Sequence, residues 1–216
     1  MLEKSFRSVL FIGLMACSIL ASACSAVNEG ELSSVYSQFA RAIEGQRGHQ
    51  ASELISKSTE VHYAKLRDIA LYGSRQRTPL TLYDEIGVYY LRARYDRQQL
   101  TKFNGRDIYA ILVENGLAGI PNMDDFLLQR ISSSGDHATA GLQTNDPSTN
   151  YRIAFSYEGG QWKIDDAALR HSRDEVLAFR MVSYKGARED VIDEILKSVG
   201  VRQGLTSQLT SPMVKS

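Results

Sequence analysis

Apolar residues in the first half of the chain recur at helical spacing. Between residues 31 and 46 they stand three and four positions apart, so they share one face of a helix. The same spacing predicts further helices at residues 51–55, 58–73, 81–93 and 104–116. Thr81 and Asn104 are residue types that favour helix N-caps, which supports two of these boundaries.

The hydrophobic period changes at about Met123. Beyond this point apolar and polar residues alternate, as in strands with one buried face. Strands are predicted at residues 126–132, 137–143, 151–157 and 162–164, with turns at 134–136, 145–148 and 158–160. Short turns connect antiparallel neighbours, so this segment is predicted to form a β-meander of three or four strands.

Helical spacing returns after the last predicted strand. Ser172 and Glu175 form a capping-box pattern, which predicts a helix that begins at Ser172 and is broken at Gly186. A last helix is predicted at residues 191–199, where Gly200 stops it.

This order of elements predicts an α+β fold. The N-terminal helices are expected to pack on a curved antiparallel β-meander, with two extra C-terminal helices that cover the sheet or pair with another copy. The domain is predicted to span residues 31–200. Residues 201–216, rich in Ser, Thr and Gln, are predicted to be a flexible tail.

The first residues have the layout of a secretory signal. Lys4 and Arg7 give a basic start, residues 8–20 are mostly apolar, and residues 21–23 are small. No charged residue occurs from 8 to 28, which is also long enough for a membrane helix. A cleaved signal and an uncleaved membrane anchor are therefore both compatible with this segment.

The stretch Leu20-Ala21-Ser22-Ala23-Cys24 resembles the lipobox of bacterial lipoproteins, although Ala21 stands where leucine is usual. The resemblance implies a signal peptide at residues 1–23, acyl chains on Cys24 and a linker at residues 24–30. A simple secreted protein is the other alternative. Cys17 is a competing lipidation site, but the apolar run before it is short.

The lipoprotein resemblance also implies a location. The protein is expected in the bacterial cell envelope, anchored to the membrane by its lipid. Ser25 follows the cysteine, where aspartate tends to retain lipoproteins in the inner membrane. The outer membrane, on its periplasmic side, is therefore the predicted site in a Gram-negative cell.

Charge and cysteine content exclude several classes of function. The chain holds 25 basic and 25 acidic residues, so it has no positive surplus for nucleic acid. Cys17 and Cys24 are its two cysteines, so the domain has neither a disulfide nor a thiolate nucleophile. The four histidines lack zinc-site spacing. We predict no metal site and no cofactor.

The order of elements and the stretch EGGQWKIDDAAL resemble nuclear transport factor 2-like domains, over about residues 32–169. This resemblance implies a cone-shaped cavity between helices and sheet, in which some members of the superfamily catalyse proton transfer and many only bind. It implies no particular catalytic residue in this chain.

A small ligand is the first binding hypothesis. Tyr63 and Arg67 are four residues apart on a predicted helix, so they share a face and could hold an anionic or carbonyl group. Trp162 could form the floor of the same pocket. The alternatives are a solvated helix edge and a core tryptophan. Asp165 and Asp166 are predicted to serve at a helix entry.

A protein partner is the second hypothesis. Tyr89, Tyr90, Arg94 and Tyr95 gather aromatic and arginine side chains, which are enriched in contact patches. A half-buried helix with a basic outer face is the alternative. The sequence thus predicts a lipid-anchored, non-catalytic protein that binds a partner, a second copy of itself or a small ligand. The alternatives are an isomerase-like or dehydratase-like pocket enzyme and an accessory subunit of an envelope complex.

Overall fold

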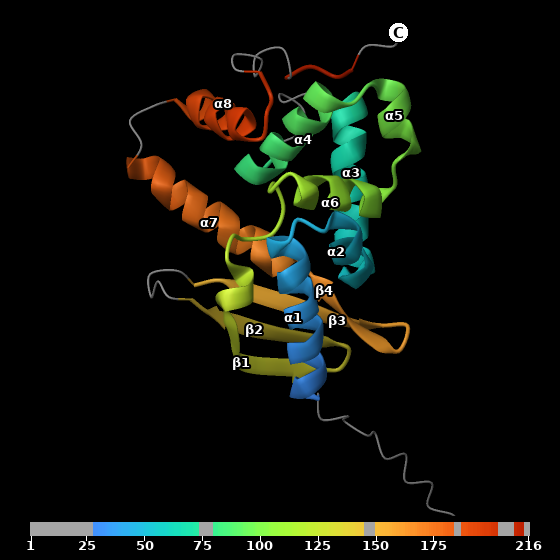
Figure 1. Ribbon diagram of the computed structural model, residues 1–216, viewed down its shortest axis with the longest axis vertical. Coiled ribbons are helices and arrows are strands. Elements are labelled where there is room, and N and C mark those ends of the chain that lie inside the picture. The colour runs from blue at the N-terminus through green and yellow to red at the C-terminus, as the bar shows by residue number, and fades with distance from the viewer. Residues whose placement is uncertain (1–27, 74–79, 145–149, 184–186, 203–209, 214–216) are drawn as a thin grey trace, which may run out of the picture.

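The computed structural model describes residues 28–73, 80–144, 150–183, 187–202 and 210–213 (Figure 1). The predicted signal peptide, Cys24, the turn at 145–148 and Gly186 lie outside these residues. Within them, none of the helices has the length and apolar content needed to cross a bilayer.

Helices precede and follow a single sheet, as the sequence predicts. The first helices are α1 Glu29–Glu44, α2 Gly48–Leu54, α3 Lys57–Tyr72, α4 Leu82–Arg94, α5 Arg97–Lys102 and α6 Gly105–Glu114. A short 3-10 helix, η1 Met123–Asp125, leads into strands β1 Leu127–Ser134, β2 His137–Gln143, β3 Arg152–Glu158 and β4 Gln161–Asp165. Two helices follow, α7 Ala167–Ser183 and α8 Arg188–Ser198. The α+β prediction is therefore confirmed.

The sheet is a meander in the order β1-β2-β3-β4, and each neighbouring pair is antiparallel. Alternate residues point to the core, so Ala138 and Phe155 are opposite one another and both buried. The β3–β4 turn contains Gly159 and Gly160, both with positive φ. In β1, a bulge between Gln129 and Ser132 interrupts the pairing.

Two helices lie on the sheet. α1 crosses the sheet (Figure 1), and the helix buries the apolar stripe formed by its residues Leu32, Val35 and Phe39. α7 starts directly after β4 and packs against β3. α1 and α7 thus supply the helical cover for the sheet.

The other N-terminal helices form a layer beyond the β4 edge of the sheet (Figure 1). Ile55 makes a parallel bridge with Ile164 of β4, and the N–H of Ser56 donates to the carbonyl of Ile164 at 2.7 Å. α6 packs against α2 and α3, where Gly48 and Gly105 let the helix backbones approach closely. The helical layer is therefore joined directly to the sheet.

Local capping patterns predict most helix boundaries, but not all. The side chains of Thr81 and Asn104 cap α4 and α6 as expected. The predicted helix start at Ser172 is wrong, because α7 begins at Ala167 and Ser172 lies inside it. The Ser172 hydroxyl instead donates to the carbonyl of Ala168 and accepts from the N–H of Arg152. This serine therefore ties α7 to β3.

The C-terminal helix covers the helical layer. α8 packs on α4, where Arg188 forms a 2.7 Å ion pair with the buried carboxylate of Glu85. In the predicted tail, Val201 is buried, and Arg97 donates to the carbonyl of Met213 at 3.1 Å. These two points of the tail contact the domain.

Candidate functional site

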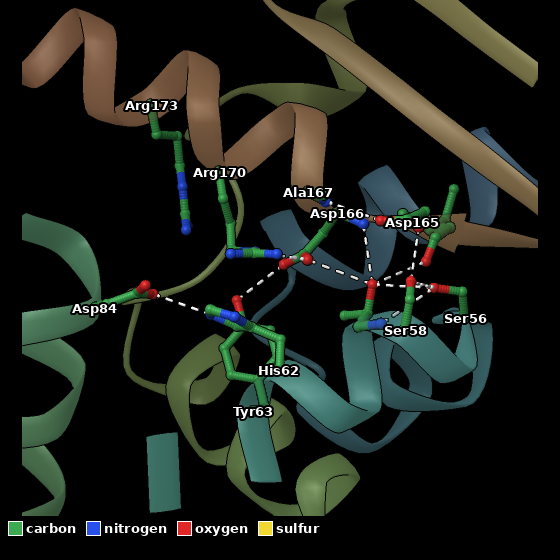
Figure 2. Close-up of polar contacts among 12 residues, drawn as sticks. Ser56, Ser58, His62, Tyr63, Asp84, Asp165, Asp166, Ala167, Arg170 and Arg173 are labelled. Atoms are coloured by element: carbon green, nitrogen blue, oxygen red, sulfur yellow. Dashed lines mark hydrogen bonds and ion pairs between the residues drawn. The ribbon is translucent and has the colours of Figure 1, made fainter. Parts of the chain in front are cut away.

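A buried carboxylate lies where β4 passes into α7. Asp166 is 3% exposed, and its Oδ2 accepts a 2.9 Å hydrogen bond from the hydroxyl of Tyr63. Its Oδ1 accepts a 2.9 Å bond from Nε of Arg170 (Figure 2). The backbone N–H of Asp166 donates to the hydroxyl of Thr59 at 3.0 Å. This one residue therefore joins α3 to the first turns of α7.

Two buried tyrosines extend the cluster into the helical layer. The rings of Tyr63 and Tyr109 meet edge to face, with centroids 4.8 Å apart. Burial raises the pKa of both phenols well above their usual value, and the charge of Asp166 raises it further. Both phenols therefore stay protonated and do not act as bases, and the hydroxyl of Tyr63 donates to Asp166. The hydroxyl of Tyr109 has no hydrogen-bond partner among the described residues.

His62 and Asp84 form a less buried pair beside Tyr63. His62 Nε2 lies 3.1 Å from Asp84 Oδ1, and the two side chains are 19% and 12% exposed. Burial raises the pKa of Asp84, but the hydrogen bond and charge of His62, together with the charges of Arg170 and Arg173, outweigh burial and hold this pKa below its usual value. The pair links α3 to α4.

Arg173 of α7 is a buried cation with few direct contacts. Its Nη1 donates to the carbonyl of Gly119 at 3.1 Å, and its Cζ lies 4.6 Å from the ring centroid of Tyr83. Its Nε has no partner within the described residues. The charges of Asp84 and Asp166 are close enough to interact with it electrostatically. Arg173 therefore sits among carboxylates that balance it at longer range.

The cluster is built to hold helices together more than to move protons. A general base needs a free lone pair that a substrate can reach. Both oxygens of Asp166 accept hydrogen bonds and the residue is buried, while Tyr63 is kept protonated. His62 is the partly accessible member, but its Nε2 is engaged with Asp84. The cluster is a polar junction of α3, α4 and α7.

The structure does not bring Tyr63 and Arg67 together on a ligand. The Tyr63 hydroxyl is taken by Asp166, whereas Arg67 donates to the carbonyl of Phe103 at 2.6 Å and to the carboxylate of Asp68. Trp162 is 9% exposed and its ring packs on that of Tyr157, with centroids 5.2 Å apart. These three side chains have separate structural contacts.

The structure corrects the predicted partner patch. Tyr89 and Tyr90 are 2% and 3% exposed, because α4 is packed between α3, α7 and α8. Tyr95 is half-buried against Phe103, and only Arg94 of the four residues is exposed. Two buried tyrosines cannot contact a partner, so these residues form no surface patch.

The arginines of this region bind the carbonyl ends of helices. Arg92 donates to the carbonyls of Ile69, Ala70 and Gly73, at the end of α3. Arg94 donates to the carbonyl of Val199, just after α8. Carbonyls at the C-terminal end of a helix carry partial negative charge and mostly lack intrahelical partners, although that of Ile69 also accepts the N–H of Gly73. The arginine content that suggested a contact surface therefore serves helix capping.

An open groove lies on the sheet side of the molecule. It has a volume of about 570 Å³ and runs between α1, η1 and β1. Its lining residues are Ser33, Tyr36, Ser37, Ala40, Arg41, Asp124, Phe126, Leu127 and Leu128. Leu127 is 65% exposed, although it is a large apolar residue. The groove thus places an exposed apolar side chain beside polar lining residues.

Sequence reasoning did not identify the groove or the cluster. Asp165 does serve the predicted helix entry, because its Oδ1 accepts from the N–H of Ala167 at 3.0 Å. Its neighbour Asp166 instead contacts Tyr63, which is 103 positions away in the chain. The available signal was the pair of carboxylates at a strand end, and it predicted only local capping.

Comparison with known proteins gives no relative. No family model, no curated protein and no solved structure matches the chain. Within the described residues, no group of three or more His, Cys, Asp or Glu side chains could hold a metal ion.

Proposed function

We propose that this protein is a lipid-anchored, non-catalytic protein of the bacterial envelope that binds a segment of a protein partner. The groove between α1 and β1 is the observation that carries this proposal. It combines an apolar floor, polar walls and the exposed side chain of Leu127. Exposed apolar residues rimmed by polar ones are typical of protein contact sites.

The shape of the groove favours a protein segment over a small ligand. Pockets for small molecules usually bury most of the ligand surface. Here Leu127 stays mostly exposed, so a small ligand would remain largely in water. A protein segment brings its own surface to cover the groove and exclude solvent from Leu127.

The position of Cys24 supports a partner at the membrane face. Cys24 precedes Asn28, the N-cap of α1, by four residues, and four residues span at most roughly 14 Å. The groove begins at Ser33, about 8 Å further along the axis of α1. With acyl chains on Cys24, the groove would lie close to the lipid surface, where other proteins of the same membrane face can reach it.

Two of the sequence hypotheses remain beside this one. α1 across a curved sheet supports the resemblance to nuclear transport factor 2-like domains, and His62 beside Asp84 is the arrangement that favours a proton-transfer enzyme. Against the enzyme, the acidic and phenolic groups next to this pair are buried and hydrogen-bonded to one another. An accessory subunit of an envelope complex would use the same groove.

A photo-crosslinking amino acid placed at position 127 tests the proposal. In the full chain, in its own membranes, we expect irradiation to give one discrete heavier adduct, because the groove holds a partner against Leu127. The matched control is position 61, since Val61 of α3 is 57% exposed but lies outside the groove. Equal labelling from both positions, or none from position 127, would overturn the proposal.

A further inference from the structure

The walls of the groove carry charges of both signs. Asp124 lies on the η1 side and Arg41 on the α1 side, and both are exposed. Asp125, next to Asp124, is also exposed. None of these three side chains forms an ion pair with another described residue. The lining therefore offers the carboxylate of Asp124 at the η1 end and the guanidinium of Arg41 on α1. Asp125 adds an exposed carboxylate next to Asp124 in the chain, so the η1 end is acidic.

Asp124, at the acidic end of the groove, lies close to the buried side chain of Tyr36. Burial raises the pKa of Tyr36, and the charge of Asp124 raises it further, so the carboxylate is near the phenol. The Tyr36 hydroxyl already donates to the carbonyl of Met123 at 2.8 Å. It is therefore not available to donate a hydrogen bond to Asp124, which leaves that carboxylate open to a ligand.

Apolar surface adjoins these charges. Phe126 and Leu128 are half-buried, and Leu127 between them is exposed. All three directly follow the η1 carboxylates in the chain, so the apolar and acidic parts of the groove are neighbours. A ligand that satisfies both needs an apolar group next to a cation.

We infer that the groove binds an extended protein segment in which a Lys or Arg stands next to a large apolar side chain. This inference rests on the proposed function and names the chemistry of its partner. The cation would face Asp124 at the η1 end of the groove, and the apolar side chain would cover Leu127. Charge complementarity of this kind sets partner choice and association rate.

The test uses the crosslinker at position 127 and the full chain in its own membranes. Asp124→Lys combined with Asp125→Lys should reduce the yield of the adduct about tenfold, because like charges then meet at the groove. The neutral pair D124N and D125N, which perturbs η1 less, should reduce it about threefold. The matched control is Glu175→Lys with Glu194→Lys, an equal charge change at exposed positions on α7 and α8.

The outcomes of this test distinguish failure of the proposed function from failure of the inference about charge. Absence of an adduct from the parent chain contradicts the proposed function itself. An adduct whose yield is unchanged or increased in both Asp124 and Asp125 variants overturns only the inference about charge. Mass spectrometry of the crosslinked peptide should show Lys or Arg within about three residues of the linked position, since successive residues in an extended segment are roughly 3.3 Å apart. A segment without a cation, or a second copy of this chain, overturns the inference.

Discussion

Asp166→Ala is expected to lower the free energy of unfolding by about 3–5 kcal/mol, the usual cost of removing one partner from a buried ion pair. The substitution removes the acceptor of the fully buried Tyr63 hydroxyl and leaves the largely buried Arg170 without its carboxylate. Chemical denaturation monitored by circular dichroism measures this change.

Asp165→Ala is the matched control for this variant. Asp165 is the neighbouring carboxylate, but it is only half-buried and accepts from Ser58 and from the N–H of Ala167. We expect its removal to cost about 1 kcal/mol, as for a hydrogen bond that water can replace. If Asp166→Ala does not fold, the isosteric Asp166→Asn serves in its place. Equal losses at positions 165 and 166 would contradict the central place of Asp166 in the junction.

Gly105→Ala is expected to destabilise the protein by about 3 kcal/mol, the upper part of the range for overpacking a close contact. A Cβ at position 105 would collide with the backbone carbonyl of Glu60 in α3. Backbone cannot rotate away as a side chain can, so α6 and α3 would have to separate. Thermal or chemical denaturation measures the loss.

Gly87→Ala provides the control for the glycine prediction. Gly87 is also buried in a helix, but its added Cβ would meet only side-chain atoms of Leu112, the nearer at 3.4 Å. Alanine has a higher helix propensity than glycine by up to about 1 kcal/mol, so this variant should be neutral or slightly more stable. If Gly105→Ala is as stable as Gly87→Ala, the close approach of α3 and α6 is contradicted.

Most helices and strands could be predicted from the sequence because local residue patterns specify them. Helical spacing gave α1 and α3 to within a few residues, and the alternation in 151–157 gave β3. The helix start at Ser172 was misplaced because the capping-box pattern of Ser172 and Glu175 occurs inside a helix that had already begun. α5 is only six residues long, too short to show a hydrophobic period.

The polar junction could not be predicted from the sequence because the residues that contact one another in it are far apart in the chain. Asp166 accepts a hydrogen bond from Tyr63, and His62 of α3 is hydrogen-bonded to Asp84 of α4. The loops between these residues bring them together, and no local sequence pattern specifies the geometry of those loops. The same limit explains the tyrosine patch. Composition showed aromatic residues and arginines on α4, but not that α8 would cover that helix.

The native mass of the chain extracted gently from its own membranes tests the proposed lipid-anchored binding role most directly. We predict a polypeptide that begins at Cys24 and carries three acyl chains, with a second, different polypeptide bound to it. A chain that still begins at Met1, carries no acyl group and has no bound partner would contradict both the anchor and the function.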